Sequence, residues 1–232
     1  MNILITGAGR GLGVDLATAA LERGHSVIAG VRQYPAEQTE ISQLAADSGG
    51  RMTIVRLDVT DEDGIAALAA DLKDAGRTLG VIINNAAVLN GTDTLLEELD
   101  IEEMRTAMDI NLYGPMRVVK HFLPLLTEPG ASIINVSSEA GSITNAYPGS
   151  FPYTISKTAL NMFSQKLHVT LQERGIHVLS VHPGWMFTDM GGAAAPTNPR
   201  TSADGILQLI EQRTMPEGRF MFVDYTGKDM EI

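Results

Sequence analysis

Short runs of consecutive apolar residues alternate along this chain with segments in which apolar residues recur every three to four positions. Uninterrupted apolar runs are typical of strands buried on both faces, and the longer period is typical of amphipathic helices. The runs predict strands at residues 2–6, 26–31, 52–57, 79–84, 131–137, 176–182 and 219–223. The periodic segments predict helices at residues 12–23, 36–47, 61–75, 152–174 and 202–213, and two helices within 100–126 that meet near 111–114.

Strands that alternate with helices predict a parallel sheet with helices on both faces, because parallel strands need a crossover that a helix supplies. Right-handed crossovers then give an α/β fold, a Rossmann fold with a doubly wound seven-stranded parallel sheet. A chain of 232 residues fits a single domain of this kind over residues 1–232. The irregular stretch at about 189–201 is rich in Gly, Ala, Pro and Asn and predicts a small loop or lid.

The composition argues against several kinds of partner. The formal net charge is −11, and an acidic surface repels nucleic acid and anionic membranes, so we expect neither as a partner. The chain has no cysteine, and its five histidines show no metal-ligand spacing, so we expect no disulfide and no metal. The first residues form neither a basic leader nor a long apolar run, and we therefore expect a cytoplasmic protein.

A glycine-rich turn follows the first predicted strand and opens the first predicted helix. Residues 6–13 read T-G-A-G-R-G-L-G. Glycines let the backbone approach a ligand closely, and a helix N-terminus offers free N–H groups and a partial positive charge. This placement predicts a site for a dinucleotide pyrophosphate at Gly7, Gly11, Leu12 and Gly13. The alternative is an ordinary turn between a strand and a helix.

The second predicted strand ends without the carboxylate that usually binds the ribose 2′-hydroxyl of NAD. Arg32 stands there instead, and an arginine suits the 2′-phosphate of NADP. Arg10, inside the glycine turn, is a candidate second arm of the same clamp. We therefore expect NADP(H) to be preferred over NAD(H). The alternative is that both arginines are solvated at the surface.

Two further strand ends carry candidate cofactor contacts. Asp58 and Val59 follow the third predicted strand, where a carboxylate meets an adenine edge or merely bonds within a turn. Asn85, Ala86 and Ala87 follow the fourth. Small side chains at this point let a cofactor approach, although an asparagine there also suits a bond to the local backbone.

Tyr153 and Lys157 are four residues apart at the start of a predicted helix, which places them on one face. A phenol has a pKa near about 10, and a nearby ammonium lowers that pKa because it stabilises the phenolate. Ser138 ends the fifth strand, where a hydroxyl points into the ligand crevice of an α/β sheet. Asn111 lies inside the long helical stretch, where asparagine indicates a kink or a buried hydrogen bond. The set suits proton transfer at an oxygen, although each residue alone also has a structural interpretation.

Taken in order, these motifs resemble the short-chain dehydrogenase/reductase family over essentially the whole chain. The matching residues are T-G-x-x-x-G-x-G at 6–13, N-N-A at 84–86, Asn111, Ser138, Y-x-x-x-K at 153–157, and Pro183-Gly184 with Thr188. Residues 182–190 and the tail at 224–227 most resemble the carbonyl-reductase-like branch, which includes the C-factor and sniffer proteins. Ala87 departs from the pattern by replacing a glycine. A slightly long interval between Ser138 and Tyr153 leaves Ser137 as a rival serine.

The resemblance implies an oxidoreductase that transfers a hydride between NADPH and a carbonyl or alcohol substrate. In that family Tyr153 would be the general acid, Ser138 would polarise the carbonyl, and Lys157 would hold the nicotinamide ribose and stabilise the phenolate. Asn111 would hold a water that links Lys157 to a proton supply. The segment that closes over the nicotinamide would contribute Pro183, Gly184, Met186 and Thr188.

The substrate is less well specified than the reaction. The segments expected to line its pocket contain Glu139, Tyr147, Trp185, Phe187 and Met190, which suggest an apolar or aromatic small-molecule carbonyl compound. We interpret His182 as strand-end packing. The family also implies a homodimer or homotetramer through the two long helices. Two alternatives remain open: a non-catalytic NAD(P)-binding signalling or regulatory protein of the same fold, and a Rossmann-like methyltransferase.

Overall fold

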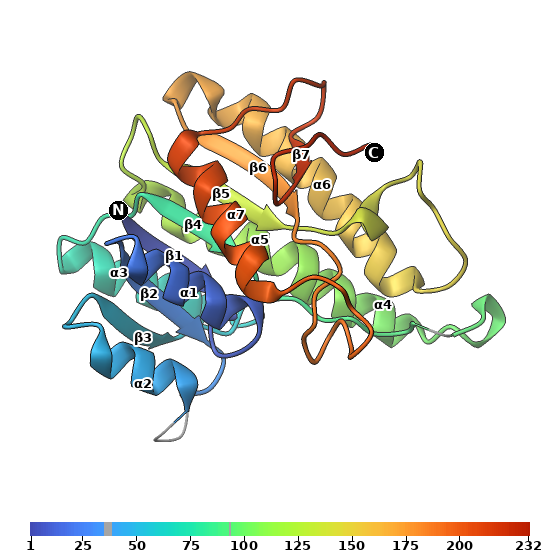
Figure 1. Ribbon diagram of the computed structural model, residues 1–232, viewed down its shortest axis with the longest axis horizontal. Coiled ribbons are helices and arrows are strands. Elements are labelled where there is room, and N and C mark those ends of the chain that lie inside the picture. The colour runs from blue at the N-terminus through green and yellow to red at the C-terminus, as the bar shows by residue number, and fades with distance from the viewer. Residues whose placement is uncertain (35–38, 93) are drawn as a thin grey trace.

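The computed structural model describes residues 1–34, 39–92 and 94–232, and its centre is a sheet of seven parallel strands (Figure 1). The strands are β1 (Asn2–Thr6), β2 (Ser26–Val31), β3 (Met52–Arg56), β4 (Val81–Asn84), β5 (Ser132–Val136), β6 (His177–His182) and β7 (Phe222–Asp224). Their order in the sheet is β3-β2-β1-β4-β5-β6-β7. The sheet therefore extends from β1 in both directions, and the predicted doubly wound topology is confirmed.

Helices cover both faces of the sheet. They are α1 (Leu12–Glu22), α2 (Glu40–Asp47), α3 (Glu62–Asp74), α4 (Ile101–Met108), α5 (Gly114–Phe122), α6 (Phe151–Leu171) and α7 (Pro199–Gln212). One core lies between the sheet and α1, α2 and α7, the second between the sheet and α3, α5 and α6 (Figure 1). Ile3 and Ile5 of β1 enter the first core and Leu4 enters the second, since successive strand side chains point to opposite faces.

Side-chain caps determine where several helices begin. Asp61 accepts a hydrogen bond from the N–H of Gly64 at 3.0 Å, as expected for a cap before α3. Asn198 caps α7 through the N–H of Arg200 at 2.9 Å, and Pro199 occupies the first turn. The loop prediction was therefore wrong at residues 199–201, which begin α7. Of the helix predicted over 36–47, residues 36–38 lie outside the described residues, and α2 begins at Glu40.

The long helical stretch is interrupted where the sequence predicts a junction. α4 ends at Met108, a π-helical turn spans Asp109–Tyr113, and α5 begins at Gly114. A π turn forms i→i+5 hydrogen bonds, which changes the direction of the side chains and carbonyls that follow. A Cβ at Gly114 would lie 2.9 Å from the Cβ of Val59, so the start of α5 packs closely against the segment after β3.

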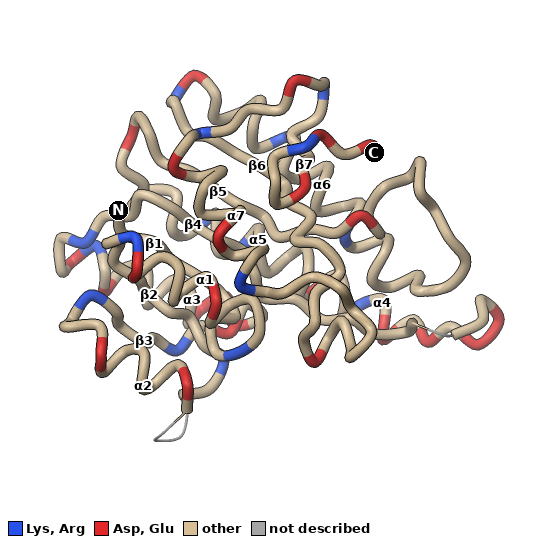
Figure 2. The backbone as a smooth tube through the Cα atoms, in the orientation of Figure 1, with Lys and Arg blue, Asp and Glu red and all other residues tan. Residues whose placement is uncertain are grey.

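Charged side chains are spread over the surface, and Asp and Glu outnumber Lys and Arg by 28 to 17 (Figure 2). The loop at residues 142–150, between β5 and α6, has no charged side chain (Figure 2). None of the helices in the described ranges combines the length and the apolar character that a bilayer crossing requires.

Candidate active site

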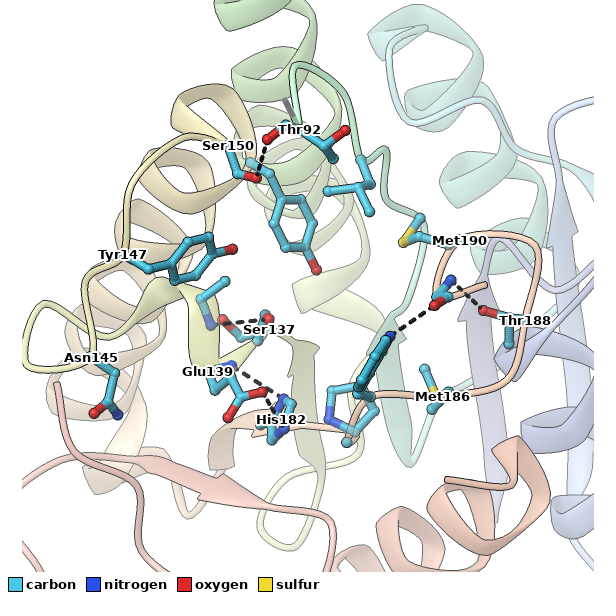
Figure 3. A pocket seen from close by; sticks show the side chains of 18 residues that line it. Thr92, Ser137, Glu139, Asn145, Tyr147, Ser150, His182, Met186, Thr188 and Met190 are labelled. Carbon is cyan, nitrogen blue, oxygen red and sulfur yellow. Dashed lines mark hydrogen bonds and ion pairs between the residues drawn. The ribbon is translucent and has the colours of Figure 1, made fainter. Parts of the chain in front are cut away.

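The carboxyl ends of the parallel strands meet at one edge of the sheet, and a cavity of about 700 Å³ opens there beyond β4, β5 and β6. Its lining comes from the segments that follow these three strands and from the start of α6. Figure 3 shows Glu139 and His182 on one side of the cavity and Thr188 and Met190 across from them. Open α/β sheets bind their ligands at this edge.

Tyr153 lies in the first turn of α6 and lines the cavity. Ser138, two residues beyond the end of β5, lines the same cavity. Burial raises the pKa of the Tyr153 phenol to about 12, and the nearby Ser138 hydroxyl acts in the opposite direction. The phenol is therefore protonated at neutral pH, which is the state that a general acid needs.

Lys157 follows one turn along α6 and is 2% exposed. Its Nζ donates a hydrogen bond to the carbonyl of Val136 at 2.8 Å and lies 5.6 Å from the centroid of the Tyr153 ring. Burial lowers the pKa of Lys157 to about 7, because removal from water disfavours the ammonium. The expected low pKa of Tyr153 is not found in this structure, where burial raises it, and stabilisation of the phenolate by Lys157 stays a prediction. The ammonium faces a ring and a carbonyl, and burial of the phenol dominates its pKa.

The two candidate serines point in different directions. The Ser137 hydroxyl is buried and donates to the backbone carbonyl of Lys157 at 3.5 Å. The Ser138 hydroxyl meets Tyr153 and accepts a hydrogen bond from the N–H of Ala140 at 3.2 Å. Of the two, Ser138 therefore has the geometry of a partner for Tyr153.

Asn111 is buried in the π turn, where its side chain ties three segments together. Its Oδ1 accepts a hydrogen bond from the N–H of Val88 at 2.8 Å, and its Nδ2 donates to the carbonyl of Val88 at 2.9 Å. The same Nδ2 donates to Ser156 Oγ at 3.0 Å. The side chain thus fixes the segment after β4 against α6 at Ser156, next to Lys157.

Space and backbone shape require glycine in the turn after β1. Gly7 has φ +65°, and a Cβ there would lie 2.9 Å from the Cα of Ala86. A Cβ at Gly13 would lie 2.2 Å from the carbonyl oxygen of Gly7. Gly11 caps α1 without a side-chain hydrogen bond, so its own side chain does not compete with a ligand for the helix N-terminus, and Leu12 is buried in the first turn.

Hydrogen bonds hold the segment after β4 against the glycine turn. Asn85 Nδ2 donates to the carbonyls of Thr6 at 3.0 Å and Gly7 at 3.2 Å. Thr6 Oγ1 accepts hydrogen bonds from the N–H groups of Asn85 and Ala86. The side chain of Asn85 thus bonds to backbone and helps to shape the turn, which was the alternative interpretation of this residue. Ala87 is half-buried.

The two arginines of the predicted clamp have different surroundings. Arg10 Nη1 lies 2.8 Å from Asp189 Oδ2, and both side chains are about four-fifths exposed. Arg32, at the end of β2, is exposed and forms no ion pair with any residue that the structure describes. Thr188 faces the glycine turn, since its Cγ2 would lie 3.7 Å from a Cβ at Gly11. The segment after β6 therefore approaches the turn from the other side.

Asp58 and Val59 serve the local structure. Asp58 Oδ1 accepts hydrogen bonds from the N–H of Thr60 at 3.0 Å and from its hydroxyl at 2.8 Å, which matches the turn interpretation. The carbonyl of Val59 accepts from Arg117 Nη1 at 3.2 Å. An adenine contact at this point stays a prediction.

Most of the predicted substrate residues line the cavity, namely Glu139, Tyr147, Trp185 and Met190. Phe187 does not, and that prediction was wrong: its side chain is 59% exposed, and its N–H pairs with the carbonyl of Thr197 at 2.9 Å. The pairing turns Phe187 outward, while its neighbours Met186 and Thr188 line the cavity together with Pro183 and Gly184.

His182 is the main residue that the sequence reasoning missed, because it lines the cavity instead of only packing a strand end. Its Nδ1 accepts a hydrogen bond from the N–H of Glu139 at 3.1 Å, so the neutral ring carries its proton on Nε2 (Figure 3). Burial lowers the pKa of His182. The position of His182 at a strand's carboxyl end was the available signal. Leu89, Thr92, Asn145 and Ser150 also line the cavity, and no motif marks them.

The residues of the glycine turn fit a dinucleotide. The turn lacks side chains where a Cβ would strike backbone, and the N-terminus of α1 supplies N–H groups suited to a pyrophosphate. Lys157 and Tyr153 lie at the other end, beside the cavity. Within the described ranges, no group of His, Asp or Glu side chains has the arrangement of a metal site.

Known proteins match this chain in sequence and in structure. A family model described as short chain dehydrogenase matches residues 1–199. The 1-hydroxy-2-glutathionyl-2-methyl-3-butene dehydrogenase of Rhodococcus sp. (strain AD45) is 32% identical over 235 residues, which cover 97% of each chain. The carbonyl reductase Sniffer of D. melanogaster has a TM-score of 0.89 at 32% identity, covering 100% of this chain and 99% of that one. An NADPH-bound carbonyl reductase from chicken fatty liver has a TM-score of 0.87 at 29% identity, with 100% and 98% covered.

Proposed function

Given that this chain belongs to the short-chain dehydrogenase family and is thus a nicotinamide-dependent oxidoreductase of CH–OH and C=O groups, we propose that it reduces aldehydes or ketones with NADPH. The observation that carries the proposal is that Tyr153 and Ser138 line one cavity together, one helical turn from the buried Lys157. Buried titratable groups that converge in a cleft are typical of catalytic sites.

The proposed roles follow from what each side chain can donate. A bound nicotinamide supplies the hydride in reduction and accepts it in the reverse reaction. Ser138 donates a hydrogen bond to the substrate oxygen, which polarises the carbonyl. Tyr153 holds its proton in the free site, because its pKa is about 12, and transfers it to that oxygen as negative charge develops. The Lys157 ammonium then stabilises the phenolate from beside the ring.

Asn111 is proposed to support the return of a proton to this site. Its side chain is occupied by Val88 and Ser156, so a relay water would be held by a backbone carbonyl of the π turn. An i→i+5 turn leaves an additional carbonyl without its usual helical partner, which supports this assignment.

Two observations support NADPH as the preferred cofactor. Residues 29–33 contain no carboxylate for a ribose 2′-hydroxyl, and Arg32 is exposed at the end of β2. Arg10 lies in the glycine turn and is proposed as a second residue that binds the 2′-phosphate. In this structure it pairs with Asp189.

The proposal extends to a homodimer or homotetramer in the cytoplasm. On α6, Ile155, Met162 and Val169 are 45%, 61% and 59% exposed and recur every seven residues, so they form one apolar stripe. A second copy of the chain would cover such a stripe without new polar partners. We keep the expectation that neither nucleic acid nor a membrane is a partner, because of the net charge of −11.

The non-catalytic regulator does not explain the buried groups. Burial of Lys157 beside Tyr153 destabilises the ammonium, and a protein that only bound a nucleotide would gain nothing from that arrangement. A methyltransferase would likewise leave both side chains without a use.

The test is binding of NADPH and NADH by fluorescence, followed by the loss of NADPH absorbance with a panel of aldehydes, ketones and quinones. We expect turnover by the wild type, and a decrease in kcat of about 10²–10⁴-fold for Tyr153→Phe with little change in the Kd for NADPH. Tyr113→Phe is the matched control, since Tyr113 is exposed on the π turn. Absence of NADPH binding, or a Tyr153→Phe variant as active as the wild type, overturns the proposal.

A further inference from the structure

Glu139 occupies the position directly after the serine that faces the substrate oxygen. Its backbone is fixed, because its N–H donates to His182 Nδ1 at 3.1 Å and its carbonyl accepts from the N–H of Ser142 at 2.9 Å. Its side chain is 59% exposed and lines the cavity (Figure 3). The carboxylate is thus held at the reacting end while it remains open to a ligand.

The cavity has an uneven balance of charge. Among the described lining residues, Glu139 is the one with a carboxylate, and none is a lysine or an arginine. The nearest cationic candidate is His182, whose Nε2 is 3.9 Å from Glu139 Oε1, beyond hydrogen-bond distance. Burial lowers the pKa of His182, so the ring is neutral at pH 7 and does not cancel the negative charge. A bound substrate therefore meets one carboxylate whose neighbour in this structure, the His182 ring, is neutral.

Aromatic rings stand on the walls of the same cavity. Tyr147 and Trp185 are 49% and 53% exposed, and Trp185 is held by a hydrogen bond from its Nε1 to the carbonyl of Gly191 at 2.8 Å. Figure 3 shows the Tyr147 side chain directed toward the cavity. Ring faces attract cations and enclose apolar groups, so these walls are compatible with a substrate that is both apolar and cationic.

We propose that the Glu139 carboxylate binds an ammonium group of the substrate, so that the enzyme selects amino ketones, or amino alcohols in the reverse direction. The proposal rests on the function proposed above. Glu139 and Ser138 line the same cavity, so one small substrate would present an ammonium to Glu139 and a carbonyl to Ser138. The same charge disfavours keto acids, because no lining lysine or arginine among the described residues would bind their carboxylate.

The kinetic test uses three ketones of similar size and different charge: β-aminopropiophenone, β-hydroxypropiophenone and β-benzoylpropionate. With the wild type and NADPH, we expect kcat/KM to be highest for the amine and lowest for the acid. In Glu139→Gln, we expect kcat/KM for the amine to fall by about tenfold or more relative to kcat/KM for the neutral ketone, chiefly through KM. Glu139→Lys is expected to reverse the order of the amine and the acid.

Calorimetry gives a second readout that needs no turnover. γ-Phenylpropylamine is a cationic analogue without a carbonyl, and phenylpropanol is its neutral counterpart. We expect the wild type with bound NADPH to bind the amine more tightly than the alcohol, and Glu139→Gln to lose that difference. Glu173→Gln, at an exposed site after α6, is the matched control and is expected to keep it. Thermal unfolding checks that all variants are folded.

The outcomes separate this inference from the proposed function. If no ketone is reduced, the proposed function falls, and the specificity for amines falls with it unless calorimetry still shows the Glu139-dependent preference. If the neutral ketone is reduced but the amine has no advantage, or Glu139→Gln leaves its KM unchanged, the inference is wrong and the proposed function stands. An equal decrease in kcat for the amine and the neutral ketone also overturns it, because Glu139 would then act on the catalytic groups.

Discussion

The two ends of the candidate site are built in opposite ways. The cofactor end, at the turn after β1, depends on the absence of side chains: a Cβ at Gly7 or Gly13 would strike neighbouring backbone. The reacting end, at the start of α6, depends on side chains that are present, with Lys157 2% exposed and Tyr153 lining the cavity beside Ser138. The first end is therefore sensitive to added atoms, and the second to a change of charge.

The origin of each end in the chain differs as well. The glycine turn is one continuous segment of eight residues, and its contacts include Asn85 after β4 and Thr188 after β6. The reacting end brings together the end of β5 and the start of α6, and Lys157 donates a hydrogen bond to the carbonyl of Val136. Local backbone shape determines the first end, and tertiary burial determines the second.

The largest effect is expected from Gly13→Ala. The new Cβ would lie 2.2 Å from the Gly7 carbonyl oxygen and 2.8 Å from the Ala8 Cα, both of them backbone atoms that cannot rotate away. Overpacking of this kind costs about 1–3 kcal/mol, and here it outweighs the gain of about 1 kcal/mol from alanine's helix propensity. We expect a decrease in the free energy of unfolding, measured with urea, together with loss of NADPH binding.

Gly24→Ala is the matched control for this variant. Gly24 has φ +81° after α1, and a Cβ there has nothing within 4 Å. We expect that variant to lose about 1 kcal/mol through backbone strain and to bind NADPH normally. Equal binding of NADPH by both variants would show that the glycine turn does not define the cofactor end.

The cofactor end could be predicted from sequence because its physics is local. Gly7, Gly11 and Gly13 lie within seven residues, between a strand and a helix whose patterns are unambiguous, and the turn formed as expected. The doubly wound parallel sheet followed in the same way, because uninterrupted apolar strands alternating with helices leave few topologies.

At the reacting end, the sequence predicted which residues lie near one another but not their pKa values. The i, i+4 spacing placed Tyr153 and Lys157 on one face, yet the spacing contains no information about burial, which sets both pKa values. For a related reason, the sequence placed Phe187 in the cavity and His182 outside it, and the structure shows the reverse. Whether a side chain faces the cavity depends on the pairing of the loop at residues 183–198, such as Phe187 with Thr197, and no local signal specifies that pairing.

The second effect is a pH dependence confined to the reacting end. Lys157 has a pKa of about 7 in the folded protein and 10.5 as its reference value, so between these values the unfolded chain binds more protons. Stability therefore rises with pH in that window, by at most about 1.4 kcal/mol per pH unit. We expect urea unfolding of the cofactor-free protein to show a gain of about 1.5 kcal/mol from pH 7 to 8.5 that Lys157→Met lacks.

Lys73→Met, at an exposed position of α3, is the control and should keep the wild-type slope. Tyr153 does not interfere in this range. Its pKa of about 12 exceeds the reference of 10.0, so it lowers stability only as pH rises above about 10. A slope shared by Lys157→Met and the wild type would mean that the ammonium is not desolvated at neutral pH, and the contrast between the two ends would lose its basis.

The smallest effect is expected from Arg32→Asp, because this part of the cofactor end acts through exposed charge. A single charge-assisted contact with a 2′-phosphate is worth about 1.5–3 kcal/mol, or roughly tenfold or more in affinity, and salt screens it. We expect the ratio of kcat/KM for NADPH to that for NADH to fall by about tenfold, with kcat for either cofactor little changed. Arg77→Asp makes the same change of charge at an exposed site before β4 and should leave the ratio as it is. If Arg32→Asp leaves the NADPH/NADH ratio unchanged while Arg10→Ala lowers it, the glycine turn alone recognises the 2′-phosphate. That result would make the cofactor end more local still, since one continuous segment would then bind both the pyrophosphate and the 2′-phosphate.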